Sequence, residues 1–407
     1  MHHDVTNQES IDAALINKGS RLKKKLLLVT PCISPVPLAV SFVVKNFLGE
    51  FAPDEFVVAA ERWPENPTAQ TETESGHPVE FISQRWTWPK RGQRYVHWAK
   101  WLTLGGVKKR LLDMIRRHDC GGILCIFPNE QLLYASYRVA VKTGLPLFPH
   151  FHNVYRENRH GMAKRIADYL QPRVFARSKI VFVMSSGMQR GWERVYPAVK
   201  FVPLTHSNCD QVPEYTPAPE WPANQIRLGF LGSINDSNLE ALGRIRQLVR
   251  SSPDVVLNLY SNAKPWFLDK VGLSGERVTA SSPSNEELIS KLQSNDLLVL
   301  PHGFEGGLAP IEYETIFPTR TVPYLLSLRP ILAHSPAHSF LNHWLREHDC
   351  AEIVDVKDLS ALRERLDWLR QNPARREELV RNALRAVQKF DAATVARQFR
   401  LQVNSYL

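Results

Sequence analysis

The sequence predicts an α/β protein built from two Rossmann-like domains. Short apolar runs alternate with helical segments, this alternation occurs twice along the chain, and a proline-rich stretch at 210–225 separates the two halves. Strands that alternate with helices indicate parallel sheets covered on both faces. A chain of 407 residues is also longer than a typical domain with one hydrophobic core. We therefore expect two such domains facing a central cleft, with C-terminal helices that brace both.

The N-terminal half is expected to form one domain over residues 23–209. A polar segment at 1–22 precedes it and is interpreted as a flexible tail, because it lacks the apolar stretch of a signal peptide. Basic and then apolar residues at 23–30 predict the first buried strand. Further strands are predicted at 56–60, 122–127, 145–151 and 180–184, and helices at 38–48, 130–142, 166–176 and after Ser185.

The C-terminal half repeats the pattern after the linker at 210–225. Its strands are predicted at 226–231, 255–260, 296–300 and 331–333. A helix is predicted to begin at Pro318 and to end before Arg329-Pro330, because proline suits a first turn and interrupts a later one. This domain is expected to span 226–385. A last helix at 386–407 is expected to pack back on the N-terminal domain.

Charge and cysteine content limit the expected partners. The formal net charge is +10 and the isoelectric point about 9.4, which suits polyanionic partners, although a merely basic protein has the same values. The basic residues accompany no nucleic-acid motif, so no nucleic-acid partner is expected. The five cysteines match no metal or redox spacing, and no apolar run approaches the length of a bilayer span. We expect a cytoplasmic protein with reduced cysteines and no transmembrane helix.

A block rich in tryptophan and basic residues lies at 85–117. It contains four tryptophans among many lysines and arginines. Aromatic rings mixed with cations suit a membrane headgroup interface, and this interpretation predicts peripheral contact with anionic lipid on the inner face of the membrane. A helix that packs its aromatic side chains inward while its cations face water explains the same residues.

The segment that begins at Pro318 has the features of an anion site. Thr319, Arg320 and Thr321 follow the proline, and their backbone amides are expected to lie free at the positive end of a helix. The guanidinium of Arg320 adds a permanent charge and a planar fork that matches phosphate oxygens. A surface ion pair of Arg320, and simple helix-start roles for the two threonines, are the alternatives.

The other candidate residues follow predicted strands, because ligands of open α/β sheets bind at the carboxyl ends of strands. The candidates from the C-terminal half are Gly232, Ser233, Ser261, His302, Gly303 and Glu305, and those from the N-terminal half are Ser34, His152 and Asn153. Gly232 and Ser233 permit close approach of a diphosphate, and His152 suits proton transfer near neutral pH. Ordinary turn or structural roles are the alternatives for each.

Over residues 23–403 the order of these elements resembles the GT-B glycosyltransferases near the broad group 1 (family four) of nucleotide-sugar enzymes. The resemblance is strongest over 226–355. Phe-Pro-Thr-Arg-Thr-Val-Pro-Tyr-Leu-Leu-Ser-Leu-Arg-Pro-Ile-Leu at 317–332 is similar to the family element P-[ST]-[KR]-x-x-E-Y-L-x-x-G-[KR]-P-[IV], which holds the donor diphosphate at a helix start. Similar segments lie at 151–153, 183–188, 232–233, 299–302, 334–336 and 350–355.

Two positions depart from the family element. Pro323 stands where a glutamate usually contacts the ribose hydroxyls, and Leu328 stands where a glycine is usual. Thr315 occupies the position eight residues before Pro323, so the E-x7-E pair of the family is absent in register. Nearby glutamates that lie out of register are Glu305, Glu312 and Glu314. The resemblance therefore supports the phosphate site more strongly than the ribose or sugar site.

The resemblance implies a retaining hexosyltransferase that takes a sugar from a nucleotide-diphosphate sugar. The C-terminal domain would bind this donor, with Gly232, Ser233, Ser261, Thr319, Arg320 and Thr321 at the nucleotide diphosphate and His302 and Gly303 at the sugar. Ser34 and Asn153 would lie on the acceptor side, and His152 and Glu305 are the catalytic candidates.

The expected acceptor is a glycan or lipid-linked glycan, as in cell-envelope or exopolysaccharide synthesis. No D-x-D motif occurs, so we expect no metal and no cofactor besides the nucleotide-sugar co-substrate. Two alternatives remain open. The absence of the glutamate at Pro323 motivates a non-catalytic nucleotide-sugar binding or scaffold protein, and an epimerase of the same fold would convert the donor without an acceptor.

Overall fold

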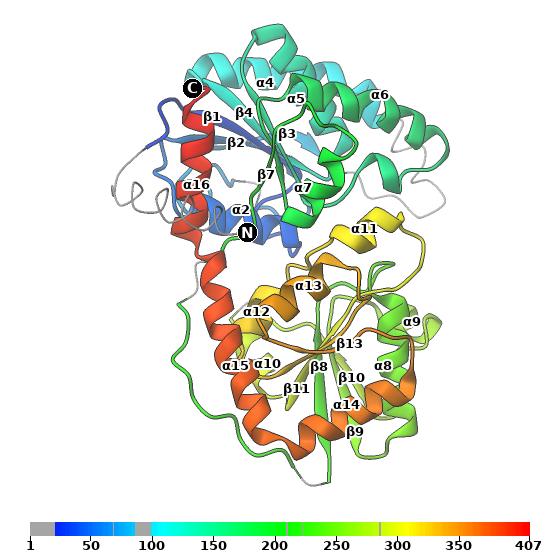
Figure 1. Ribbon diagram of the computed structural model, residues 1–407. Helices are drawn as coiled ribbons and strands as arrows, with labels where there is room; N and C mark the ends of the chain where they lie inside the picture. Colours follow the sequence, from blue (N-terminus) through cyan, green and yellow to red (C-terminus); the bar gives the residue numbers. More distant parts are fainter. Residues whose placement is uncertain (1–20, 68, 86–98, 209–210, 223, 285) are drawn as a thin grey trace. The chain divides into compact units, whose positions relative to one another are not determined.

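The computed structural model describes the chain except for residues 1–20, 68, 86–98, 209–210, 223 and 285. The chain divides into two compact units, the first comprising residues 1–148 and 392–407 and the second residues 149–391. The described residues form one seven-stranded and one six-stranded sheet, which confirms the predicted α/β class with two parallel sheets. Figure 1 shows how these strands and the helices are arranged. The domain bounds expected from the sequence stay a prediction.

The seven-stranded sheet has the strand order β3-β2-β1-β4-β5-β6-β7. Its strands are β1 Leu26–Thr30, β2 Phe56–Arg62, β3 Val79–Gln84, β4 Gly122–Phe127, β5 Leu147–Phe151, β6 Val181–Val183 and β7 Phe201–Pro203. The accompanying helices are α2 Ala39–Leu48, α4 Leu104–His118, α5 Glu130–Thr143, α6 Gly161–Arg177 and α7 Ser186–Glu193. Strand β1 pairs in parallel with β2 and with β4, so the direction of strand addition reverses between β1 and β4.

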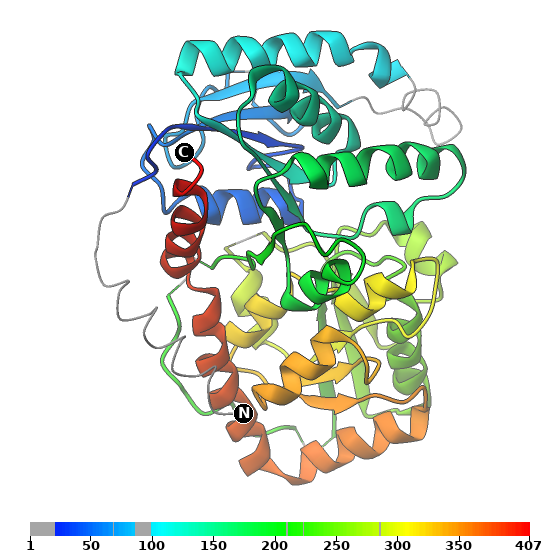
Figure 2. The same ribbon diagram turned by 45° about the horizontal axis from the view of Figure 1, so that its top comes forward.

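The C-terminal helix belongs to the first unit. Helix α16, Ala392–Asn404, lies beside α2 in both views (Figures 1 and 2). Phe399 of α16 packs edge-on against Phe47 of α2, with ring centroids 5.0 Å apart, and it also contacts the rings of Phe51 and Phe56. Burial of four aromatic side chains explains why the end of the chain joins this unit, because each removes a large apolar area from water.

The six-stranded sheet has the order β10-β9-β8-β11-β12-β13. Its strands are β8 Ile226–Leu231, β9 Val255–Tyr260, β10 Val278–Ser281, β11 Leu297–Pro301, β12 Ile331–His334 and β13 Glu352–Val354. The helices are α8 Leu239–Ser251, α9 Pro265–Lys270, α10 Leu288–Gln293, α11 Pro310–Thr315, α12 Thr321–Leu326, α13 Phe340–Glu347, α14 Leu359–Gln371 and α15 Pro373–Val387. Strand β8 pairs in parallel with β9 and with β11, so the order reverses between β8 and β11.

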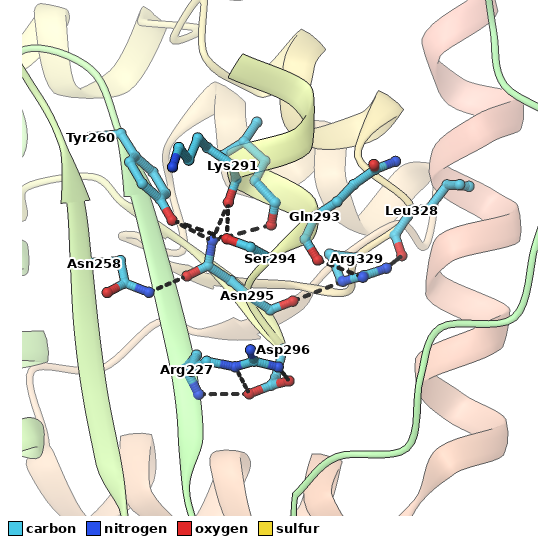
Figure 3. A network of polar contacts seen from close by, with 11 residues as sticks. Arg227, Asn258, Tyr260, Lys291, Gln293, Ser294, Asn295, Asp296, Leu328 and Arg329 are labelled. Atoms are coloured by element: carbon cyan, nitrogen blue, oxygen red, sulfur yellow. Dashed lines mark hydrogen bonds and ion pairs between the residues drawn. The ribbon is translucent and has the colours of Figure 1, made fainter. Parts of the chain in front are cut away.

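A buried polar network joins the residues just before β11 to the neighbouring strands β8 and β9 (Figure 3). The amide of Asn295, which is 1% exposed, accepts from Asn258 at 2.8 Å and donates to Tyr260 Oη at 3.0 Å. Asp296 pairs with Arg227 of β8 through a 2.8 Å contact. A Cβ on Gly229 would lie 2.7 Å from the Asn295 side chain, so glycine is needed for this close approach.

Leu328 belongs to the same region (Figure 3) and has a backbone conformation that favours glycine. Its φ is +57°, in the left-handed region, and its carbonyl accepts from Arg329 Nη1 at 3.0 Å. The side chain is buried beside Val380 and Leu384 of α15. Burial against α15 offsets the steric cost of a positive φ, which for ordinary residues is about 1–2 kcal/mol.

Candidate functional site

The carboxyl ends of β8 and β11 form the switch point of the six-stranded sheet, which is where open α/β sheets bind ligands. Gly232 follows β8 with a φ of +112°. Its amide donates to Tyr260 O at 2.8 Å, which keeps the end of β8 joined to the end of β9. A Cβ at position 232 would lie 3.4 Å from the guanidinium of Arg320. Gly232 therefore permits the chain to pass close to that cation.

Arg320 places its guanidinium over the end of β8. Its Nη2 donates to Ser233 O at 3.3 Å, and its Cζ lies 4.7 Å from the centroid of the Phe230 ring. Nη1 is buried and has no hydrogen-bond partner among the described residues. Burial lowers the pKa of Arg320 below its ordinary value, but an arginine remains charged at neutral pH. A buried cationic donor without a partner is costly unless a ligand supplies the acceptor.

Tyr324 holds helix α12 at this position. Its hydroxyl accepts from the amide of Leu231 at 2.8 Å and donates to Val299 O at 3.1 Å. One side chain of α12 thus contacts the last residue of β8 and the middle of β11. Tyr324 lies in the segment 317–332, which resembles the family element. The structure shows how this tyrosine fixes Arg320 relative to Gly232.

The helix start differs from the one that the sequence predicts. Helix α12 begins at Thr321 rather than at Pro318 and has only six residues. The amide of Thr321 donates to Pro318 O at 3.0 Å, so it is not free for a ligand, and the expectation of a free amide there was wrong. A tight turn at residues 318–321 therefore takes the amide of Thr321. Thr319 is partly exposed, and Thr321 is buried with its Oγ1 unpartnered among the described residues.

The loop after β11 contributes His302 and Gly303. His302 is 1% exposed, and its Nε2 lies 2.7 Å from Tyr313 O. Burial lowers the pKa of His302 to about 4, so the ring is neutral at pH 7. Nε2 must then carry the proton that it donates to this carbonyl, and Nδ1 is left as an acceptor. Gly303 donates to Ser237 O at 2.7 Å, which fixes the loop.

Glu305 lies close to Gly303 in the same loop, but its side chain is not buried. It is exposed, and it pairs with Lys357 at 2.7 Å. An exposed ion pair is weak, so this contact does not lock the carboxylate.

A cavity of about 530 Å³ opens beside the switch point, between the ends of β9 and β10 and helix α9. Ser261 and Asn262 line it on one side, and Leu268 and Leu273 form part of an apolar wall. Ser261 directly follows Tyr260, whose carbonyl oxygen accepts a hydrogen bond from the amide of Gly232. The cavity and the Arg320 site are therefore neighbours along one edge of the sheet. A volume of this size is typical of small-molecule sites.

His152 and Asn153 follow β5 and lie in the second unit. His152 Nε2 lies 3.3 Å from His150 Nδ1, and burial holds the pKa of His152 well below its usual range. The amide of Asn153 donates to Glu312 Oε1 at 2.9 Å. Asn153 is thus already engaged within the protein.

Glu312 is a buried acceptor that the sequence does not predict as a site residue, because it lies out of register with the family element. Its carboxylate is 2% exposed and accepts from Asn153, from the Val154 amide at 2.9 Å and from Asn158 at 3.2 Å. Burial raises the pKa of Glu312 although these donors favour its charged form. The sequence shows two asparagines after β5, Asn153 and Asn158, whose side-chain amides need acceptors. Their spacing in the sequence does not identify Glu312 as the acceptor.

Replacing Glu312 by alanine is expected to lower the free energy of unfolding by about 3–5 kcal/mol, because it leaves buried donors without their acceptor. Urea unfolding of the full chain measures this. Glu314→Ala, two residues away and partly exposed, is the matched control and is expected to change stability by less than about 1 kcal/mol. Equal effects of the two substitutions would contradict a structural role for Glu312.

Ser34 lies in the first unit, and its hydroxyl donates to Glu74 while its carbonyl accepts from Gln70 at 3.2 Å. Within the described part of the chain no cluster of three or more histidine, cysteine or acidic side chains is arranged to hold a metal. The expectation that no metal or cofactor is needed stays a prediction.

The tryptophan-rich block is described only in part. Residues 86–98, which carry three of its four tryptophans, lie outside the described residues. Trp101 is partly buried, with its ring centroid 5.6 Å from that of Tyr134. Among the helices that the structure describes, none combines the length and the apolar character that a membrane span requires.

Comparison with known proteins finds similarity in structure alone. No family model matches the chain, and no curated protein matches it in sequence. Sucrose-phosphate synthase from Thermosynechococcus elongatus superposes with a TM-score of 0.67 at 12% identity, over 92% of this chain and 97% of that one. HepE from Anabaena in complex with UDP-glucose superposes with a TM-score of 0.68 at 14% identity, over 94% and 100%. An α,α-trehalose-phosphate synthase from Burkholderia xenovorans, in complex with glucose-6-phosphate, gives 0.65 at 12%, over 92% and 98%. At these identities the likeness establishes a shared fold.

Proposed function

We propose that this chain, which has the GT-B fold, is a glycosyltransferase that transfers a sugar from a nucleotide-diphosphate sugar to a glycan or lipid-linked acceptor. The observation that carries this proposal is the guanidinium of Arg320, which lies over Gly232–Ser233 with one buried nitrogen unpartnered among the described residues. Such a group suits a phosphate oxygen. The similar structures that contain UDP or UDP-glucose support a nucleotide sugar as the donor.

The proposed donor pose follows the edge of the six-stranded sheet. The diphosphate would contact Arg320 and the backbone at Gly232–Ser233, with Thr319 and Thr321 beside it. The nucleoside would enter the cavity at Ser261, whose apolar wall suits a base and whose hydroxyl suits a ribose. The sugar would lie toward His302 and Gly303, where His302 Nδ1 accepts a hydrogen bond from a hydroxyl.

The chemistry that this pose favours is stabilisation of the leaving nucleotide. Negative charge grows on the diphosphate as the bond to the sugar breaks, and a fixed cation at that point stabilises the transition state more than the ground state. A pKa well below the usual range makes His152 a poor proton acceptor at neutral pH. We therefore assign to His152 a hydrogen bond to a substrate hydroxyl, and to Glu305 the role of proton acceptor, since it is exposed to solvent.

The finer parts of the proposal rest on the sequence. A hexosyl donor, retention of configuration, a metal-independent reaction, Ser34 and Asn153 on the acceptor side, and a role in polysaccharide synthesis follow from the family resemblance. Cytoplasmic location with peripheral contact to anionic membrane is supported by the net charge of +10 and the tryptophan-rich block.

A panel of nucleotide sugars tests the proposed activity. We expect at least one to raise the thermal unfolding midpoint, because a ligand that binds only the folded state stabilises it, and the same compound to be consumed when acceptor glycans are added. Binding without turnover would favour the scaffold alternative, and conversion of the donor without an acceptor would favour the epimerase. No stabilisation by any nucleotide sugar would refute donor binding.

A further inference from the structure

A second polar pocket lies in the first unit, at the carboxyl ends of β2 and β3. It has a volume of about 350 Å³ and is bounded by the end of β2, by β3, by the start of α4 and by the start of α5. It shares no lining residue with the Arg320 site, which belongs to the second unit. We propose that this pocket binds a hydroxylated ligand that carries a negative charge, such as a sugar or polyol bearing a phosphate or a carboxylate.

A β-bulge shapes this pocket. The parallel register of β2 and β3 pairs Ala60 with Phe81 and then Glu61 with Ser83, so Ile82 is an additional residue on β3. The bulge brings Glu61 and Ser83 opposite each other at the end of the strand pair. Bulges often occur next to binding sites, where they change the direction of a side chain.

Glu61 and Ser83 both carry a buried oxygen that lacks a partner. Glu61 is 1% exposed, and its Oε1 accepts from Lys100 Nζ. Its Oε2 has no hydrogen-bond partner among the described residues, and Arg85 Nη1, at 3.9 Å, is beyond hydrogen-bond distance. Ser83 Oγ is also unpartnered within the described part of the chain. The carboxylate oxygen of Glu61 can accept a hydrogen bond from one ligand hydroxyl, and the hydroxyl of Ser83 can donate to another oxygen of the ligand.

The charge of the lining favours an anionic ligand over a cation. Arg62, Lys100 and Arg110 line the pocket, and Glu61 is the one acidic residue among the lining residues. Arg110 is fixed by a 2.9 Å bond from Nη1 to Ile82 O, and Arg62 lies over the Phe81 ring at 4.3 Å. Three cations against one carboxylate give an excess of positive charge, which attracts a phosphate or carboxylate and disfavours a metal ion.

The two halves of the lining thus recognise two parts of one ligand. The pair of Glu61 and Ser83 binds hydroxyls, and the surrounding cations bind the anionic group. Only the further interpretation of this ligand as the sugar acceptor depends on the proposed glycosyl transfer, because the pocket and its charges are independent of the donor site.

Calorimetric titration of the full chain without nucleotide sugar tests the proposal. The probes are glucose, glucose 6-phosphate, glucuronate and inorganic phosphate. We expect glucose 6-phosphate or glucuronate to bind at least about tenfold more tightly than glucose and than inorganic phosphate, because of these probes only the two charged sugars combine sugar hydroxyls with a negative charge. The stronger of the two identifies the anion. Binding of neither charged sugar, or equal binding of glucose, would overturn the proposal.

Substitutions locate the binding. Glu61→Gln is expected to weaken binding of the preferred probe about tenfold, and Ser83→Ala to weaken it in the same direction by less. Glu65→Gln, an exposed carboxyl outside the pocket lining, is the matched control and is expected to leave the affinity unchanged. Unchanged binding in both Glu61→Gln and Ser83→Ala would also refute the site.

Two further measurements distinguish a loss of binding in this pocket from misfolding and from binding at the donor site. If Glu61→Gln does not fold, as judged by circular dichroism, Ser83→Ala alone decides the outcome, because it removes one oxygen and no charge. Arg320→Ala is expected to bind the charged sugar normally. Loss of binding in Arg320→Ala would place the ligand at the donor site and overturn the proposal, whereas failure of this pocket leaves the nucleotide-sugar proposal intact.

Discussion

Replacing Arg320 by alanine is expected to weaken binding of a nucleoside diphosphate roughly 10- to 100-fold, because hydrogen bonds to charged groups contribute about 1.5–3 kcal/mol. The rate of transfer is expected to fall further, by about 100- to 1,000-fold, since charge on the leaving group grows in the transition state. Titration calorimetry measures the first effect, and steady-state kinetics with a nucleotide sugar measures the second. Arg320→Lys is expected to recover part of the binding but not the forked geometry.

The stability of Arg320→Ala provides the control for this prediction. The variant loses a 3.3 Å hydrogen bond to Ser233 O and the contact with the Phe230 ring, but it also removes a buried nitrogen that has no partner among the described residues. These effects oppose each other, so we expect little change in the unfolding midpoint. Arg250→Ala, which removes an exposed arginine from the end of α8, is the matched substitution and is expected to leave binding unchanged. Unaltered nucleotide affinity in Arg320→Ala would show that the diphosphate binds elsewhere.

The second unit is expected to lose stability steeply as the pH falls from about 6.5 toward 4. Burial lowers the pKa of His150 to about 3 and that of His206, His302 and His334 to about 4, and the pKa of His152 is also well below its usual range. Unfolded histidines titrate near 6.5. Between these values the unfolded chain binds more protons, so stability falls as the pH falls, by about 1.4 kcal/mol per pH unit for each such histidine.

Urea unfolding at pH 7, 6 and 5 measures this slope. His206→Gln is expected to reduce the slope of the free energy of unfolding against pH by the contribution of one histidine, about 1.4 kcal/mol per pH unit. His343→Gln is the matched control, because His343 is exposed on α13 and is expected to leave the slope unchanged. The prediction is wrong if His206→Gln and the unsubstituted chain lose stability in parallel between pH 6.5 and 5.

Long apolar runs made the inner strands predictable. The sequence identified β1, β2, β4, β5, β6, β8, β9, β11 and β12, and it missed β3, β7, β10 and β13. The four missed strands are the outer strands of the two sheets. An edge strand pairs on one side only, and these four are short or partly exposed, so they do not require a continuous apolar run. Periodicity therefore carries little signal for them.

The candidate site residues also include correct and incorrect predictions. Strand ends and the family element identified Gly232, Ser233 and Arg320, and the structure brings these three together. The expected free amide at Thr321 was wrong, because a local turn takes that amide.

The sequence by itself determined the fold class, the inner strands of both sheets and the segment that carries Arg320, because burial imposes a local apolar pattern and a short motif keeps its own spacing. Only the tertiary structure decided which polar groups meet. The carboxylate of Glu312 contacts residues more than 150 positions earlier, and Glu61 lies opposite Ser83 through one additional residue in a neighbouring strand. Such contacts arise from strand register and packing between distant segments, to which no local pattern in the sequence corresponds.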